Sequence, residues 1–294
     1  MSTASCRRSA RAALAGVRPP ASCFMAVVAR FDEDVEWLHR APIAYTIVNK
    51  STAVPNEGYD ASSFLWFIVD RYGLALPEFT LFMHAHERSW HHAQYSQLAS
   101  MLIAFEQLPN NGFLSVSHGD QGQMLYTEKE PMAELSHAEH QRLRRDIIGL
   151  DTPLVHTGGR VRFPACAQFW VRRDRILSHP RSYYERLYKV MVDGRHPLLA
   201  RFAAAEGYPS RHLHNLFLEA HWHWIFGEPE RYQPPFELYS HLPFVTGVVP
   251  DVTGSVPEWM RRRAAMRYWG PGQQKGLSAA AGWDKGGRRP CSRP

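Results

Sequence analysis

The sequence lacks several signals that would point to a common class of protein. Its four cysteines form no Cys-x-x-Cys pair, so neither a thiolate zinc site nor a disulfide framework is indicated. No apolar run approaches the roughly 18 residues that a membrane span needs, so we expect no transmembrane segment and no clear secretory signal. The P-loop, Gly-x-Gly-x-x-Gly and Gly-x-Ser-x-Gly motifs are absent, which argues against an NTPase, a dinucleotide oxidoreductase and an α/β-hydrolase.

Acidic residues are scarce at both ends of the chain, and the formal net charge of +6 originates there. Residues 1–23 carry four arginines and no acid, and residues 261–294 carry nine basic residues against Asp284. The ends therefore hold +4 and +8, which leaves −6 for residues 24–260. A basic groove for a phosphate backbone is not indicated there, and we expect no nucleic-acid partner.

Composition predicts three segments. Residues 251–294 are rich in Gly, Pro and basic residues without an apolar period, which predicts a disordered basic tail. Residues 1–22 are Arg- and Ser-rich, as organellar transit peptides are, but a short disordered basic leader is the preferred interpretation. Residues 23–250 contain no Pro-, Gly- or Ser-rich linker and no internal repeat, which predicts one domain.

Within that domain, strand-like and helix-like segments alternate, which predicts an α/β fold with a mostly parallel central sheet covered by helices. Asp32 or Asp34 is expected to cap a short helix through Trp37 and Leu38. The expected strands are Phe24–Arg30, Ile43–Asn49, Phe79–His84, Gly112–Ser117 and Ala167–Val171. The expected helices cover residues 60–72, 89–105, 136–147 and 209–226, with helical sequence also from Asp174 to a break at Pro180.

Several short motifs occur in a fixed order along the chain. They are Asn49-Lys50, Pro55-Asn56-Glu57-Gly58, Asp70-Arg71-Tyr72, Phe82-Met83-His84-Ala85-His86, Ser89-Trp90-His91, Cys166-Ala167-Gln168-Phe169, Leu218-Glu219 and Phe226-Gly227. In this order the chain resembles the family known as domain of unknown function 3431, from about Phe24 to Pro234. A group of collinear motifs is more specific than any one of them.

That family is similar in layout to nucleotide-sugar glycosyltransferases of the A-type fold, which implies one Rossmann-like domain. The resemblance also implies a nucleotide-sugar donor, a hydroxyl acceptor on a glycan, protein or lipid, and a place in the secretory pathway. The sequence alone does not fix the compartment. The chain departs from the family pattern at Tyr59, where a basic residue is usual, and it has His84-Ala85-His86 in place of an Asp-x-Asp metal motif.

His84 and His86 are the candidate metal ligands. Two residues apart on a strand, their side chains would leave the same face, and imidazole suits Mn²⁺ or Zn²⁺ better than Mg²⁺. The resemblance implies a divalent cation, Mn²⁺ or Mg²⁺ with Zn²⁺ as a further option, or direct contact with the pyrophosphate. The alternative is that both histidines bond to loop backbone at the edge of the sheet.

Polar residues at the ends of predicted elements are the candidate donor-binding residues. Helix capping and ordinary turns are the alternative roles for most of them. The candidates are Asp32, Asp34, Asn56, Asp60 and Gln168.

Glu219 is the candidate catalytic residue. It lies four residues before His223 on one helix face, among aromatic residues that would disfavour its charged form and suit it to act as a base. An inverting glycosyl transfer needs one such base. The alternative is a hydrogen bond in the core beneath Trp222 and Trp224, and His221 is expected at the surface.

The predicted function is therefore a glycosyltransferase-like enzyme that moves a sugar from a nucleotide donor to a hydroxyl acceptor. The first alternative is a non-catalytic carbohydrate- or nucleotide-binding module that retains the fold. The second alternative is a His-based metallohydrolase, for which the sequence provides many histidines but no complete ligand set.

Overall fold

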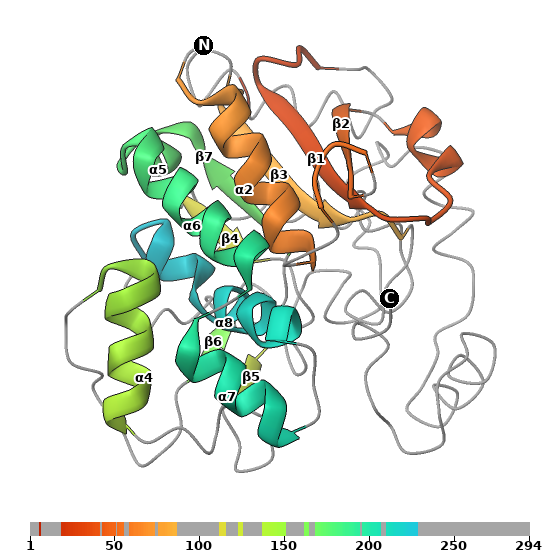
Figure 1. Ribbon diagram of the computed structural model, residues 1–294. Coiled ribbons are helices and arrows are strands. Elements are labelled where there is room, and N and C mark those ends of the chain that lie inside the picture. The colour runs from red at the N-terminus through yellow and green to blue at the C-terminus, as the bar shows by residue number, and fades with distance from the viewer. Residues whose placement is uncertain are drawn as a thin grey trace.

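A mixed five-stranded sheet with helices packed against it forms the centre of the computed structural model (Figure 1). The structure describes Cys6 and residues 19–41, 43–50, 52–55, 59–73, 76–86, 112–115, 123–125, 137–150, 162–164, 168–194, 196–206 and 210–228. The predicted α/β class is confirmed. The predicted leader is described only at Cys6 and residues 19–22, and the predicted tail, 251–294, lies outside the described residues.

Seven strands and the helices between them are described. The strands are β1 (Phe24–Arg30), β2 (Ala44–Asn49), β3 (Phe79–His84), β4 (Phe113–Ser115), β5 (Gln123–Leu125), β6 (Arg162–Pro164) and β7 (Phe169–Arg172). The helices are the 3-10 helix η1 (Glu36–Arg40), α2 (Tyr59–Arg71), α4 (His137–Leu143), the π-helical turn η2 (Arg144–Ile148), α5 (Arg173–Ile176), α6 (Arg181–Asp193), α7 (Pro197–Glu206) and α8 (Ser210–Ile225).

The strand order in the main sheet is β2-β1-β3-β7-β4. β1 pairs in parallel with β2 and β3, whereas β7 pairs antiparallel with both β3 and β4. The sheet is therefore mixed, where a mostly parallel one was expected. The sequence pattern of β7 shows that the strand is buried but carries no information on its direction, because both directions bury the same side chains.

An aromatic cluster joins the sheet to its helices. The ring of Phe64 on α2 lies 4.9 Å from that of Phe82 on β3, and Phe82 lies 5.2 Å from Phe169 on β7. Phe169 in turn lies 5.3 Å from Trp222 on α8. All four side chains are buried, so α2 and α8 are fixed to the sheet through one apolar contact surface.

The predicted elements agree well with the observed ones where both can be compared. The strands Phe24–Arg30 and Phe79–His84 are found as predicted, and the last long helix is Ser210–Ile225. The predicted helix over 89–105 lies outside the described residues. None of the described helices has the length and apolarity that crossing a bilayer requires.

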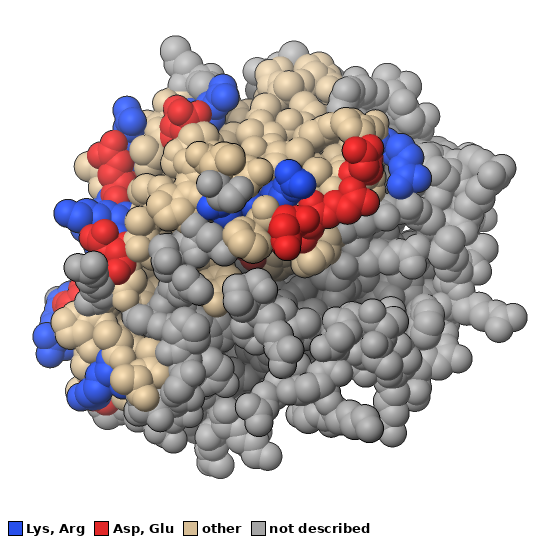
Figure 2. Space-filling view, turned by 45° about the vertical axis from the view of Figure 1, so that its right-hand side comes forward, with Lys and Arg blue, Asp and Glu red and all other residues tan. Residues whose placement is uncertain are grey.

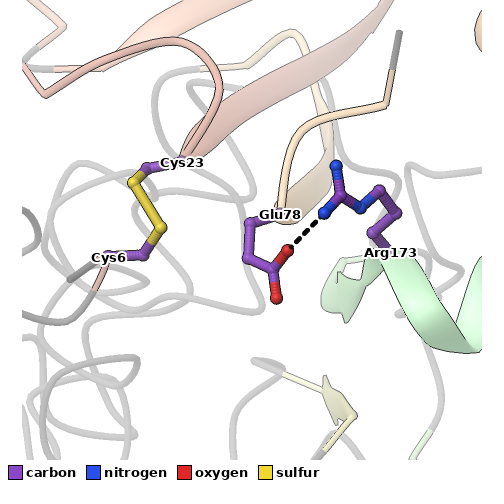
Figure 3. Close-up of a disulfide and its surroundings, with 4 residues drawn as sticks. All are labelled: Cys6, Cys23, Glu78 and Arg173. Carbon is purple, nitrogen blue, oxygen red and sulfur yellow. Dashed lines mark hydrogen bonds and ion pairs between the residues drawn. A yellow bond between two sulfur atoms is a disulfide. The ribbon is translucent and has the colours of Figure 1, made fainter. Parts of the chain in front are cut away.

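A disulfide joins Cys6 to Cys23, which the sequence did not indicate (Figure 3). Cys23 immediately precedes β1, and the ion pair between Glu78 and Arg173, 3.1 Å long, lies beside it at the start of β3 and α5. Two cysteines separated by 17 positions carry no spacing signal, since their pairing depends on where the fold places them. The bond ties an N-terminal residue to the edge of the sheet at which β1 and β3 begin.

We predict that Cys6→Ser lowers the free energy of unfolding by about 3 kcal/mol, because the unfolded chain gains the freedom of a loop of this size. Urea unfolding measured with and without a thiol reductant checks this. Reductant should lower the midpoint of the wild type to that of the variant and leave the variant unchanged. Equal midpoints for oxidised wild type and variant would contradict the prediction.

Candidate functional site

The carboxyl ends of β1, β2 and β3 meet at one edge of the sheet. From β1 the chain passes to β2 on one side, and α2 then returns it to β3 on the other side of β1. Such a reversal of strand order is the place where open α/β sheets bind ligands, just outside the strand ends. We call the polar residues there the strand-end cluster: Glu33, Lys50, Asp60, His84, His86, Asn215 and Glu219.

Three nearly buried ionisable side chains form the centre of the cluster. The ammonium of Lys50 donates to Asp60 Oδ1 at 2.9 Å, and His84 Nδ1 lies 2.6 Å from Asp60 Oδ2. Val48 and His84 both align with Ala29, and Lys50 follows Val48 by two positions. The side chains of Lys50 and His84 therefore leave the same face of the sheet, which is the face that Asp60 approaches from α2.

Asp60 and its two basic partners stabilise one another's charged forms, although the charge of Lys50 opposes that of His84. Burial alone would raise the pKa of the Asp60 carboxyl, but the charges of Lys50 and His84 outweigh it and hold that pKa well below its usual range. Burial would lower the pKa of His84, yet Asp60, helped by Glu219, raises it. The pKa of Lys50 is likewise raised against burial by Asp60 and Glu33.

The turns after β1 and β3 are fixed to each other. Glu33 Oε1 lies 3.8 Å from Nε2 of His86, and the backbone N–H of Phe31 donates to Glu33 Oε2 at 2.6 Å. The indole N–H of buried Trp37 donates to the carbonyl of Ala85 at 2.9 Å. Burial, together with the charge of His84, lowers the pKa of His86 against the attraction of Glu33. The rim of the cluster is thus preorganised by contacts between its two turns.

Helix α8 brings Glu219 to the cluster through Asn215. The amide of Asn215 donates to Glu219 Oε1 at 2.5 Å, and its own Oδ1 accepts the backbone N–H of Ala61 at 3.3 Å. Ala61 is the neighbour of Asp60, so one side chain ties the first turn of α2 to Glu219. Asn215 itself is 5 % exposed, which makes the link a buried one.

The backbone at the start of α2 adopts a rare conformation. Tyr59 has φ of 48°, in the left-handed region that bulky residues seldom occupy, and its carbonyl accepts the hydroxyl of Ser62 at 2.8 Å. Strained backbone of this kind gathers at ligand sites, where the surrounding structure holds it in place.

The sequence profile of the family described as Protein of unknown function (DUF3431) matches residues 26–238. The chain belongs to this family. No curated protein and no solved structure matches the chain. The match includes every residue of the strand-end cluster, so the cluster lies within the part of the chain that defines the DUF3431 family.

The structure brings most of the predicted site residues of this DUF3431 protein to one edge. Asp60, His84, His86 and Glu219 belong to the cluster. Gln168 is fully buried and lies one residue beyond the Phe82–Phe169 pair, toward the carboxyl end of β3.

Two of the remaining three predicted donor contacts, Asp32 and Asp34, can be placed. Asp34 accepts the backbone N–H of Glu36, the first residue of η1, at 2.9 Å, while Val35 occupies the N-cap position. Asp32 is exposed after β1, and Asn56 lies outside the described residues. Asp60 is the second residue of α2, and its carboxylate contacts Lys50 and His84 from there.

Acidic side chains form a band on one face of the described part, bordered by basic ones (Figure 2). The turn after β1 supplies Asp32, Asp34 and Glu36, which are exposed, while Glu33 is half-buried. Because exposed charges are screened by solvent and salt, the electrostatic interactions of this turn are weaker than those of the buried ions of the cluster.

His221, expected at the surface, is buried instead. Its Nδ1 lies 2.5 Å from the carbonyl of Phe217 one turn earlier, and the two rings stack at 4.1 Å. Burial, with the charge of His140, holds the pKa of His221 well below its usual value. The prediction of a surface position for His221 assumed that one side of α8 is exposed to solvent. In the structure α4 and β6 also pack against α8.

The described side chains do not fit a divalent cation at His84 and His86. Among the residues that the structure describes, no group of three or more His, Cys, Asp or Glu side chains could hold a metal ion. His84 is directed to Asp60 and His86 to Glu33, with side-chain exposures of 13 % and 59 %.

Sequence reasoning missed Lys50 and Asn215 as site residues. A signal for Lys50 was present, since it is a basic residue directly after a predicted strand, at the edge where ligands bind. Asn215 lies one helical turn before Glu219, a spacing at which side chains meet, but nothing marked it among the other polar residues of the helix.

We predict that the contribution of His84 to stability falls as pH rises. The pKa of His84 is raised in the folded state, so its contribution is complete below about pH 6.5 and is lost as pH rises through the folded pKa. The difference in unfolding free energy between wild type and His84→Gln should shrink at up to about 1.4 kcal/mol per pH unit there.

Urea unfolding between pH 5.5 and 9 measures this, with His86→Gln as the control. The pKa of His86 is lowered, so its replacement should not reproduce the decline with rising pH. A difference between wild type and His84→Gln that stays constant over the range would show that His84 does not gain a proton on folding.

Proposed function

We propose that this DUF3431 protein is a glycosyltransferase-like enzyme that transfers a sugar from a nucleotide-sugar donor to a hydroxyl acceptor. One observation carries the proposal: at the reversal of strand order, β2, β3, α2 and α8 converge on a nearly buried acid–base group of Lys50, Asp60, His84 and Glu219. A nearly buried group of mutually perturbed ionisable side chains at such an edge is typical of a functional site.

Glu219 is the residue proposed to take the proton. In the transfer, the bond from the anomeric carbon to the phosphate oxygen breaks, the acceptor oxygen bonds to that carbon, and the acceptor proton passes to the Glu219 carboxylate. The hydrogen bond from Asn215 fixes one oxygen of that carboxylate and holds the group at the edge of the cluster.

The donor is proposed to lie across the ends of β1 and β3, beside the exposed side chains of Asp32 and His86. Asp60 is proposed as a positioning residue, since both of its carboxylate oxygens contact protein side chains. The disulfide fits the secretory location that the resemblance implies, because such bonds persist in oxidising compartments.

A non-catalytic binding module is the second candidate. The same engagement of both Asp60 oxygens favours it, because an ion group that is satisfied within the protein can serve stability alone. A His-based metallohydrolase remains a prediction, and no group of described side chains supports its ligand set.

We predict that one class of nucleotide sugar raises the melting temperature of the full chain. Ligand that binds the folded state stabilises it by mass action, by about 2.7 kcal/mol at 100 times the dissociation constant. A thermal-shift screen of uridine, guanosine and cytidine nucleotide sugars at millimolar concentration tests this, with the free sugars as controls. If none of the nucleotide sugars shifts the melting curve, both the enzyme and the nucleotide-binding module are excluded.

We predict that Glu219→Gln lowers turnover by about 10²–10⁴ while leaving donor affinity unchanged, because a positioned base contributes that much to the rate. Glu185→Gln, an exposed change on α6, is the matched control and should retain full turnover. Sugar transfer or donor hydrolysis, with isothermal titration of donor, provides the two measurements. A lower melting temperature with unchanged turnover would instead assign Glu219 a structural role.

A further inference from the structure

The carboxylate at the centre of the cluster has its two oxygens directed at protein cations. The Lys50 ammonium contacts Asp60 Oδ1 at 2.9 Å, and His84 contacts Asp60 Oδ2 at 2.6 Å. Glycosyl transfer from a nucleotide donor needs positive charge near the departing diphosphate, which a divalent cation often supplies. In this structure the positive charge beside Asp60 comes from Lys50 and, when protonated, His84.

We propose that the Lys50–Asp60–His84 group takes the part of a divalent cation, so that the site binds the diphosphate of its ligand through protein cations and needs no metal. This inference rests on the proposed function for the identity of the ligand. The placement of Lys50 and His84 does not depend on the proposed function. Both side chains lie on one face of the sheet, at the edge where the strands end.

Burial makes the Lys50 charge effective. The side chains of Lys50, Asp60 and His84 are 7 %, 12 % and 13 % exposed, so each retains a small accessible part at the strand ends. Charges in such surroundings are less screened than those at the surface, and with His84 protonated the two positive charges exceed the single negative charge of Asp60, which favours binding of a phosphate. Because Asp60 holds Lys50 and His84 in place, they need little ordering when an anion binds.

The other two acids of the strand-end cluster, Glu33 and Glu219, also have partners within the protein. Glu33 contacts His86 on the rim, and Glu219 contacts Asn215. Neither carboxylate converges with Asp60 in a group that could hold a metal, among the residues described. Asp60, Glu33 and Glu219 thus each have partners of their own within the protein.

The experiment is isothermal titration of the full chain with inorganic pyrophosphate in excess EDTA. We expect binding in EDTA and, after dialysis, an affinity within about threefold of it when Mn²⁺ is added. Lys50→Met should weaken this binding at least about tenfold, whereas Lys189→Met, an equal change at an exposed position on α6, should leave it unchanged.

Lys50→Met leaves the Asp60 charge with one partner fewer, so its folding is checked by circular dichroism. The double variant Lys50→Met/Asp60→Asn removes both charges together and should show the same loss of binding in a folded protein. No binding of pyrophosphate in EDTA, binding that requires Mn²⁺, or wild-type binding by the folded double variant would each overturn the inference.

The outcomes separate this inference from the proposed function. Sugar transfer that occurs only with Mn²⁺ would uphold the function and overturn the inference. Lys50-dependent pyrophosphate binding in EDTA without binding of any nucleotide sugar would uphold the anion site and overturn the function.

Discussion

The ion group centred on Asp60 is the interaction on which the site depends. One carboxylate joins the end of β2 through Lys50 to the end of β3 through His84, from the first turn of α2. Burying three charges is unfavourable unless each is paired, and removal of one partner from such a group typically costs about 3–5 kcal/mol. The Asp60 side chain therefore links the ends of β2 and β3 to the start of α2.

The apolar core beneath the cluster makes this arrangement possible. Phe64 and Phe82 lie a few residues from Asp60 and His84 on the same elements, and their rings pack on each other and on Phe169. Trp222 extends the contact to α8, the helix that carries Glu219. Because cores are close-packed, these aromatic side chains restrict the movement of the ionisable groups next to them.

The chemistry of the strand-end cluster suits both functions that are considered for this DUF3431 protein. The Glu219 carboxylate, which Asn215 fixes, could accept a proton. The nearly buried Lys50 ammonium could bind an anion. An enzyme and a binding module would share the proposed anion site. Only in the enzyme would the Glu219 carboxylate accept the proton of an acceptor hydroxyl.

Periodicity and chain punctuation were enough to predict the elements that position the site. The buried runs Phe24–Arg30 and Phe79–His84 could be read as strands, because a strand covered on both faces appears as a continuous apolar segment. Asp60, His84 and His86 could be selected because ionisable residues at the ends of such segments stand out from an apolar background, and Glu219 because it lies four residues before His223 among aromatic residues.

Other features were decided only by the tertiary structure. The direction of β7, the disulfide between Cys6 and Cys23, and the buried position of His221 all depend on which segments become neighbours. The sequence determined that polar groups would follow buried strands at one edge of a sheet. That Lys50 and His84 both face Asp60 was decided by the register of β1 with β2 and β3, because this register places their side chains on the same face of the sheet.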